Sequence, residues 1–251
     1  MILTIDVEKI TDTNFNIKWI KTPNIDYERL IDNFIELSKN VDKKIAFVLG
    51  SFAKEYPELV KKLYKNNIEI ASHGYNHDLV YKKSFLEWSE DIYKSKSLLE
   101  DLISKEIKGY RSPSWSLPFD KKYYNELAKR GYKYSSSYFP IKTYMYGNSI
   151  NKKQPFKIYT ENGIITEYPI SKNFIPFSGG FYLRVLPLSV LKYLFKNTEN
   201  SILYIHPYEL LDKNLIAYFK NYAEFNLDFF LAFYSLGLPK NKIKEILNVT
   251  K

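Results

Sequence analysis

The sequence predicts an α/β protein in which βα units surround a parallel sheet, closed into a barrel or left open. Three observations lead to this prediction. Short apolar runs alternate with amphipathic segments along the chain. The 251 residues fit one large domain, which we expect to span residues 1–251, and no linker or repeat divides them. Hydrophobic residues form 45% of the chain, which is enough for one interior and unlike a disordered protein.

The strands that we expect are short and apolar. They cover residues 2–7, 45–50, 68–71 and 202–205, and a further strand ends just before Arg111. The run 45–50 is continuously apolar and ends in glycine, which is typical of a buried parallel strand. The expected helices cover residues 27–38, 57–66, 85–102 and 121–130. In the first of them, Leu30, Ile31 and Phe34 recur at helical spacing.

Side chains that can carry chemistry follow these strands at the point where each ends. In α/β proteins the loops at the carboxyl ends of strands converge and form the site. The residues in these positions are Asp6, Glu8, His73, His77, Arg111 and His206. They include all three histidines of the chain. One histidine taken alone is usually structural, but three at strand ends indicate a functional site.

The histidine pair predicts a metal centre. His73 and His77 stand four residues apart and reach one ion if their segment begins as a loop and turns into a helix. This spacing alone is a weak signal, so a third ligand is needed. Because the chain has no cysteine, any metal is held by histidine, carboxylate and water, and Glu8 or Asp6 can supply the third ligand. Asp6 and Glu8 alternate along a strand and point to the same side, so one can bind metal and the other can deprotonate a water molecule.

Two further residues complete a hydrolytic set. Arg111 begins the segment RSPSW and is placed to lower the pKa of a nearby catalytic carboxylate through its charge. His206 follows an apolar strand and is suited to protonating a leaving group. Metal, base, arginine and acid together indicate hydrolysis of an amide or an ester.

The charge pattern favours an ordinary solvated surface. The net charge is +9, but lysine pairs such as Lys43-Lys44 are scattered rather than massed in one tract. The N-terminus lacks the pattern of a signal peptide, and no run approaches the roughly 18 apolar residues of a membrane span. We therefore expect a cytoplasmic protein with no nucleic-acid partner and no stable insertion into a membrane.

Five blocks of sequence occur in an order that points to one family. They are Thr4-Ile5-Asp6-Val7-Glu8, Ser72-His73-Gly74-Tyr75-Asn76-His77, Gly109-Tyr110-Arg111-Ser112-Pro113, Gly131-Tyr132-Lys133-Tyr134-Ser135-Ser136-Ser137 and Leu203-Tyr204-Ile205-His206-Pro207. With these blocks the chain resembles the polysaccharide deacetylases of the NodB-homology type, carbohydrate esterase family four. A further block, Glu167-Tyr168-Pro169 followed by SGGFYLR over residues 178–184, resembles the branch associated with exopolysaccharide and surface-glycan loci.

The resemblance implies a distorted (β/α) barrel of about seven strands in a single domain. It also implies a metal-dependent hydrolase that removes an acetyl group, in the first instance N-acetyl, from an acetylated sugar or oligosaccharide. The sugar would belong to a surface polysaccharide or to its cytoplasmic precursor, which suggests a part in cell-surface glycan biosynthesis. Zinc is the metal that we expect first, and cobalt or nickel would substitute for it.

The resemblance also implies a role for each matched residue. These roles are Asp6 as general base, His73 and His77 as metal ligands, Arg111 as the residue that orients the base, His206 as general acid, Leu203 as lining for the acetyl methyl group, and the Ser114 backbone amide as a donor to the oxyanion.

Two positions depart from the family pattern. Most members have a second aspartate where this chain has Val7, so we assign the third metal ligand to Glu8. Members often have an aspartate that supports the catalytic histidine where this chain has Ser135. Either another carboxylate such as Glu167 takes that role, or His206 is less well tuned.

Three more residues are candidates for binding the substrate. Trp115 and Tyr182 are suited to stacking on sugar faces. Arg184 pairs either with a phosphate or uronate of the substrate or with a carboxylate in a structural salt bridge, and the sequence favours neither. Two other functions remain open. One is a metal-dependent amidase for a small nitrogenous compound, and the other is a non-catalytic glycan-binding protein in which the site has decayed.

Overall fold

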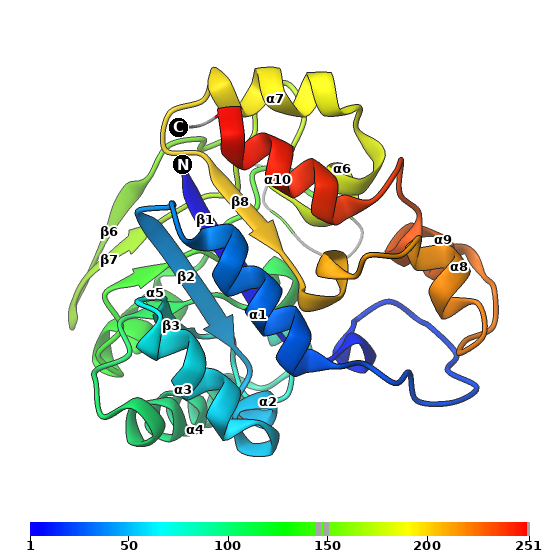
Figure 1. Cartoon of the computed structure of the whole chain (residues 1–251). Coiled ribbons are helices and arrows are strands. Elements are labelled where there is room, and N and C mark those ends of the chain that lie inside the picture. The colour runs from blue at the N-terminus through cyan, green and yellow to red at the C-terminus, as the bar shows by residue number, and fades with distance from the viewer. Residues whose placement is uncertain (144–146, 148–150, 250–251) are drawn as a thin grey trace. The chain divides into compact units, whose positions relative to one another are not determined.

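The structure is a computed structural model, and it describes residues 1–143, 147 and 151–249 (Figure 1). In this part of the chain eight strands form one sheet in the order β6-β7-β5-β4-β3-β2-β1-β8. Their bounds are β1 (Ile2–Val7), β2 (Lys43–Val48), β3 (Glu69–Ser72), β4 (Gly109–Tyr110), β5 (Tyr134–Ser135), β6 (Phe156–Thr160), β7 (Gly163–Glu167) and β8 (Ile202–Ile205). The predicted fold class, a distorted barrel of βα units, is confirmed, with eight strands where we expected about seven.

Ten α-helices accompany these strands in the described part of the chain. They are α1 (Tyr27–Ser38), α2 (Gly50–Glu55), α3 (Pro57–Lys65), α4 (Phe85–Ile103), α5 (Lys121–Lys129), α6 (Gly180–Val185), α7 (Leu188–Lys196), α8 (Leu215–Phe219), α9 (Leu227–Phe233) and α10 (Pro239–Val249). Four short 3₁₀ segments also occur: η1 (Ile10–Asp12), η2 (Val80–Lys82), η3 (Pro113–Trp115) and η4 (Pro207–Leu210). Capping side chains mark the N-terminal ends of several helices. Ser84 and Glu87 form a capping box at α4, and Asp26 caps α1. None of the helices described here is long and apolar enough to cross a lipid bilayer.

By its internal contacts the chain divides into two compact units. The first consists of Met1–Lys44 and Ser171–Lys251, and the second is Ile45–Ile170. The single domain over residues 1–251 stays a prediction.

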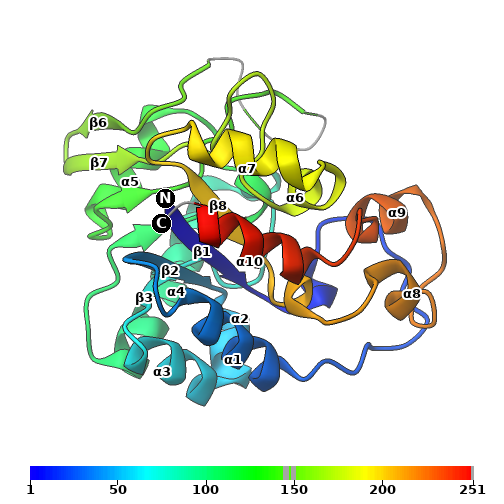
Figure 2. The same ribbon diagram turned by 45° about the horizontal axis from the view of Figure 1, so that its top comes forward.

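In the first unit, β1 and β8 pair in parallel and lie side by side in Figures 1 and 2. Because Ile5 stands opposite Ile205, Asp6 and His206 follow at the same end of the two strands. Helices α7 and α10 pack against each other, as Figure 2 shows. A separate apolar core, here called the aromatic cluster, includes Tyr208 of η4. It consists of Ile10, Ile17, Tyr208, Leu215, Phe219, Ala223, Phe229, Ala232 and Phe233.

In the second unit, parallel pairing again aligns strand ends. Ser72 of β3 stands opposite Tyr110 of β4, and Tyr110 stands opposite Ser135 of β5. The residues that follow these positions, His73, Arg111 and Ser136, therefore leave the sheet side by side. Strand β7 continues the parallel set, with Glu167 opposite Ser135.

One hairpin departs from the predicted parallel pattern. Strands β6 and β7 are antiparallel, and the turn between them ends at Gly163 with φ of +139°. Asn162-Gly163 between two β-branched segments is a recognised hairpin signal, although neither strand was among the predicted elements. The sheet is consequently mixed, not purely parallel.

Candidate metal centre and hydrolytic site

The two histidines of the second block lie on a tight loop after β3. Their rings are 5.2 Å apart between centroids, and both side chains are buried. The loop turns sharply because Gly74 and His77 both have positive φ values, of 80° and 58°. A turn into a helix was the condition under which we expected this spacing to serve one ion, and the segment meets no such condition, because residues 73–79 contain no helix. The left-handed conformation at His77 brings its ring back towards His73 within the loop itself.

The ring of His73 is oriented by the backbone of the neighbouring strand. Its Nδ1 lies 2.9 Å from the carbonyl oxygen of Arg111, and its backbone N–H donates to the carbonyl of Val48. Since a carbonyl only accepts, Nδ1 carries a proton, and Nε2 points away from the Arg111 carbonyl. A backbone carbonyl that fixes the tautomer in this way is the usual outer partner of a metal-binding histidine.

Helix α4 holds the histidine loop from the other side. Asp91 Oδ1 accepts the Tyr75 backbone N–H at 2.9 Å, and Asp91 Oδ2 pairs with Lys83 at 3.0 Å. Ser72 Oγ donates to Ser95 Oγ at 3.0 Å. These contacts satisfy polar groups of a tight, buried turn, so the histidine pair sits on a rigid support.

Arg111 is fully buried at the end of β4. Its Nη2 donates to Ser136 Oγ at 3.0 Å, and its guanidinium lies 4.0 Å from the centre of the Phe47 ring. The neighbouring Ser112 N–H donates to Ser137 Oγ at 2.9 Å. The serines after β5 thus fix the direction in which Arg111 leaves the sheet. Its predicted role in orienting the base stays a prediction.

The segment after Arg111 has an unusual backbone. Ser114 and Trp115 both have φ of 48°, a conformation that residues with a side chain rarely adopt. Trp115 is buried, and its ring lies 5.7 Å from that of Phe139. This burial leaves little of the Trp115 ring face for a sugar. The Ser114 amide remains the predicted oxyanion donor.

Glu167, the carboxylate that we considered as support for His206, is held within the second unit. Its Oε1 accepts the backbone N–H groups of Ser137 and Tyr138 at 2.7 and 3.0 Å. Burial raises the pKa of Glu167 to about 7, against hydrogen bonds from Ser135, Ser137 and Tyr138 that lower it. Glu167 therefore ties the serine segment after β5 to the end of β7.

In the first unit, three titratable side chains gather where β1 and β8 end. Asp6 and Glu8 are buried, with exposed fractions of 2% and 4%. His206 Nε2 lies 3.9 Å from Glu8 Oε1. Burial lowers the pKa of His206, but the bond to Glu209 and the charges of Glu8 and Asp6 outweigh it and raise the pKa above its ordinary value.

The carboxylate that contacts His206 is Glu209, which was not among the candidates predicted from the sequence. Its Oε2 accepts the His206 backbone N–H at 3.0 Å and lies 3.4 Å from His206 Nδ1. The signal was present in the sequence, because a glutamate three residues after the cap of a helical turn is the capping-box pattern.

The remaining candidates have different surroundings. Arg184 is buried and donates from Nη1 to Glu209 Oε1 at 2.8 Å, so the geometry favours the salt-bridge alternative. Leu203 is fully buried in β8. Tyr182 on α6 is half-buried, with its ring edge-on to Phe181. The substrate-binding roles of Leu203 and Tyr182 stay predictions.

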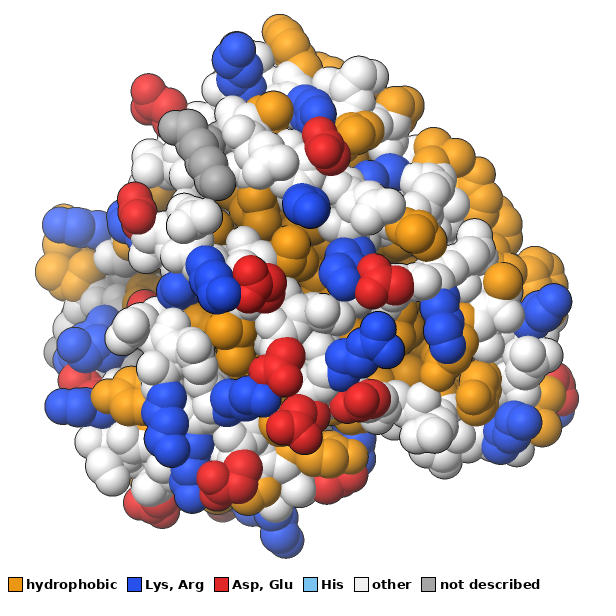
Figure 3. All heavy atoms as spheres, in the orientation of Figure 1, with side chains coloured by type: hydrophobic (Ala, Val, Ile, Leu, Met, Phe, Trp, Pro, Cys, Tyr) orange, Lys and Arg blue, Asp and Glu red, His pale blue; other side chains and the backbone are white. Residues whose placement is uncertain are grey.

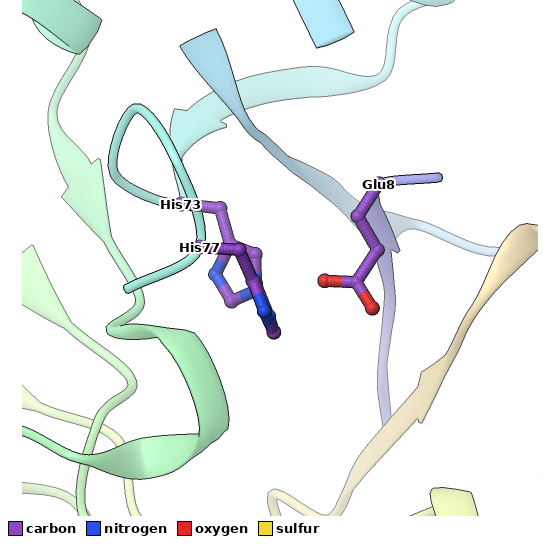
Figure 4. Close-up of side chains that lie close together, drawn as sticks. All are labelled: Glu8, His73 and His77. Atoms are coloured by element: carbon purple, nitrogen blue, oxygen red, sulfur yellow. The ribbon is translucent and has the colours of Figure 1, made fainter. Parts of the chain in front are cut away.

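Within the described residues, one group of side chains has the donor set of a metal centre. Glu8, His73 and His77 each offer one ligand atom, and these atoms all lie within 4.8 Å of one another (Figure 4). All three side chains are buried. Two imidazoles and a carboxylate are a set known from catalytic zinc sites, and it leaves a position open. These are the three residues that the sequence predicted as metal ligands.

Fold and site together define a class of protein. The strand ends of this α/β protein carry two buried histidines, two carboxylates and a third histidine with its own acidic partner. These are the side chains that a metal-dependent hydrolase uses. Residues 23–135 match the polysaccharide deacetylase family, and residues 136–247 match a domain family of unknown function, DUF3473. The match to the polysaccharide deacetylases covers 113 of the 251 residues, and these residues include His73, His77 and Arg111. No curated protein matches the chain.

Solved structures resemble the fold at low identity. One is a putative polysaccharide deacetylase from Mycobacterium smegmatis, with a TM-score of 0.56, 16% identity, and coverage of 82% of this chain and 77% of that one. Another is a family 4 carbohydrate esterase from Streptomyces lividans in complex with acetate, with a TM-score of 0.53, 11% identity, and coverage of 99% and 86%. A third is a mutant, with restored enzymatic activity, of a family 4 pseudoenzyme from Bacillus anthracis. Its TM-score is 0.50 at 16% identity, over 82% of this chain and 56% of that one.

Proposed function

We propose that this protein is a metal-dependent hydrolase that removes an acetyl group, first of all N-acetyl, from a sugar. The observation that carries the proposal is the buried group of Glu8, His73 and His77 in a chain whose residues 23–135 match the polysaccharide deacetylase family. The substrate that we infer is an acetylated sugar of a surface polysaccharide or of its precursor. The block 178–184 supports this choice through its resemblance to the surface-glycan branch. The cytoplasmic location stays a prediction.

The three side chains fit a divalent metal. A buried carboxylate is costly unless a positive charge balances it, and a cation at this group supplies that charge. The hydrogen bond from His73 Nδ1 to a carbonyl leaves Nε2 as the ligand atom. Zinc suits this donor set best, and cobalt or nickel would also be accepted. A bound ion would supply a Lewis acid for the acetyl carbonyl and favour the ionisation of a water molecule.

The protein's own residues then divide the proton transfers. Asp6 takes the proton from the attacking water molecule, and Arg111 orients Asp6 for this transfer. His206 donates a proton from Nε2 to the sugar nitrogen as it leaves. The raised pKa of His206 suits an acid, because it increases the fraction that carries the proton at neutral pH.

Other residues would orient the acetyl group and the sugar. The unusual backbone at Ser114 presents an amide that is suited to the oxyanion, since a fixed donor costs no reorganisation during the reaction. Leu203 would contact the acetyl methyl group. Tyr182, half-buried on α6, is the better placed of the two aromatic candidates for stacking on a sugar ring.

A screen for acetate release tests this function. The purified protein, loaded with zinc, is incubated with acetylated nucleotide sugars and with surface-glycan fragments, and acetate and ammonia are both measured. We expect acetate from at least one sugar, and a decrease of at least about 100-fold in Asp6→Asn and His206→Ala. Ammonia from small amides without acetate from sugars would instead indicate the amidase. Glycan binding without product, together with loss of zinc on dialysis, would indicate the binding protein with a decayed site.

A further inference from the structure

Within the first unit, a continuous line of polar contacts leads from His206 through Glu209 to Arg184. Glu209 lies at its centre and is bridged on both sides. Its Oε2 faces the Nδ1 of His206 at 3.4 Å and accepts the backbone N–H of the same residue at 3.0 Å. Its Oε1 accepts from Arg184 Nη1 at 2.8 Å. The exposed fractions of the Arg184 and Glu209 side chains are 2% and 0%, so water does not screen the pair.

The ring of His206 has little freedom to turn. It stacks on Tyr208, with centroids 5.2 Å apart and planes 15° apart, and Tyr204 meets it edge-on. Tyr208 itself belongs to the aromatic cluster and is buried there. With Nδ1 towards Glu209, the opposite nitrogen, Nε2, faces Glu8 at 3.9 Å. The ring is therefore held in one of its two possible directions.

Glu209 keeps its negative charge despite complete burial. Burial raises its pKa, but the hydrogen bond to His206 and the charge of Arg184 outweigh burial and hold the pKa below its ordinary value. A charged carboxylate only accepts hydrogen bonds, so the nitrogen that faces it carries a proton. The Nδ1–H tautomer of neutral His206 follows from this contact.

The block 178–184 places Arg184 within reach of Glu209. Gly179 bridges to Tyr204 on β8, and Tyr204 N–H donates to the Ser178 carbonyl. A Cβ atom at Gly179 would overlap the Tyr204 carbonyl oxygen, and one at Gly180, where φ is +53°, would lie 2.5 Å from Tyr204 Oη. Only glycine lets α6 begin this close to β8. Arg184 then stands in the last turn of α6, and its Nη2 also donates to the Leu231 carbonyl at 3.0 Å.

We propose that Glu209 is the positioning residue of His206, and that Arg184 holds Glu209 charged and in place. Segments 178–184 and 206–209 thus act together, and they fix both the direction of the His206 ring and its tautomer. This inference rests on the proposed function, in which His206 protonates the leaving group. Glu209 supplies the carboxylate that this chain does not have at Ser135, and it does so from the histidine's own helical turn.

The kinetics of a variant at Glu209 test its positioning role. Glu209→Gln keeps the shape but removes the charge, and we expect kcat to fall about 10–100-fold with KM within about twofold. Zinc content should not change, because Glu8, His73 and His77 remain. Glu126→Gln is the matched control, since Glu126 is also buried and also pairs with an arginine, Arg130, at 2.8 Å. If the two variants lower kcat equally, Glu209 is merely structural and the proposal is wrong.

Substitutions at Arg184 test whether this residue holds Glu209 charged and in place. Arg184→Lys keeps a positive charge near Glu209, and we expect its kcat to stay within about fivefold of the wild type. Arg184→Gln should lower kcat as far as Glu209→Gln does. Equal losses in both Arg184 variants would show that charge on this residue is not what His206 requires, and would overturn the part assigned to Arg184.

A spectroscopic test does not depend on activity. The chain has three histidines, so ¹⁵N-histidine labelling gives three imidazole spectra, and His206→Asn identifies the relevant one. We expect His206 of the wild-type protein as the Nδ1–H tautomer at a pH where it is neutral, and a mixture of tautomers in Glu209→Gln. The same tautomer in both proteins would refute the positioning role. If the tautomers of the two proteins differ as expected but no sugar yields acetate, the proposed function is wrong and the positioning role of Glu209 still stands.

Discussion

The residues of the proposed site are buried and polar, and each of them needs a partner because burial removes its hydrogen bonds to water. Glu8 is the clearest case. The sequence alone left Asp6 and Glu8 as alternative ligands, since alternation on a strand puts both on one side. The resemblance turned the choice to Glu8, because this chain has Val7 where most family members have a second aspartate. The close approach of its carboxylate to two imidazole nitrogens accords with that choice.

We predict that Glu8→Ala loses zinc. Removing a direct ligand should weaken binding by more than the roughly 10–100-fold that loss of an outer partner costs. Zinc content after dialysis, followed by calorimetric titration of the metal-free protein, measures the change. Glu126→Ala removes a buried carboxylate elsewhere and should bind zinc as the wild type does. Undiminished zinc in Glu8→Ala would reject Glu8 as the third ligand.

Glu167 offers a second prediction at this scale, concerning pH. Its pKa is about 7 in the folded protein against an ordinary 4.5, so the folded state binds the proton more tightly. The resulting stability is fully present below about pH 4.5 and is lost as the pH rises through 7. A shift of this size corresponds to about 3 kcal/mol of unfolding free energy.

Glu167→Gln should remove this dependence, because an amide imitates the protonated carboxyl group at every pH. Urea unfolding at pH 5 and pH 8 would show the variant gaining stability relative to the wild type at the higher pH. Glu126→Gln is a control with the opposite sign. Burial raises the pKa of Glu126, but the Ser89 and Arg130 contacts lower it overall, so its contribution is lost as the pH falls. An identical pH profile for Glu167→Gln and the wild type would contradict the prediction.

Among the elements, those with a strong local pattern were predicted well. Helix α1 ends where its amphipathic spacing ends, and β1 and β8 match the predicted runs. Strand β2 lies two residues earlier than expected, because Gly50 begins α2 instead of closing the strand. The pattern of apolar residues did not predict Lys43 and Lys44 as part of the strand, because these charged residues lie outside the apolar run. Helices α6 to α10 were not predicted, because three of them have only five to seven residues and depend on tertiary packing.

The histidine loop gives a prediction at the scale of an element. Asp91→Ala removes the acceptor of the Tyr75 N–H and the partner of Lys83. The loop should then hold His73 and His77 less firmly, and zinc affinity should fall about 10–100-fold. Unfolding free energy should fall by about 1–3 kcal/mol.

Asp91→Asn separates geometry from charge. It keeps an oxygen at the Oδ1 position for the Tyr75 N–H and loses the ion pair with Lys83. We expect near wild-type zinc affinity in Asp91→Asn, as measured by the same titration. If Asp91→Ala and Asp91→Asn weaken zinc binding alike, the hydrogen bond to the loop is not what supports the site.

Over the whole molecule, the order of the strands decides which residues meet, and the sequence shows this only through strand ends. Parallel pairing brings Asp6 to His206 across 200 residues, and His73 to Arg111 across 38. The sequence predicted these groups because each follows an apolar run. Glu209 was missed because it follows no strand and lies within a helical turn. The charged side chains on the face drawn in Figure 3 are of both signs and interspersed, which suits a solvated surface.

The metal itself should stabilise the whole fold. Glu8 and His73 are 65 residues apart in the chain, so the ligand group exists only in the folded protein, and zinc binds that state in preference. Free zinc at 100 times its dissociation constant adds about 2.7 kcal/mol to the unfolding free energy. For a chain of this length that corresponds to a rise in Tm of about 5–10 °C. Thermal unfolding with zinc and with a chelator measures it. His77→Ala should show no rise and Glu126→Gln the full rise, and an equal rise in His77→Ala would place the ion elsewhere.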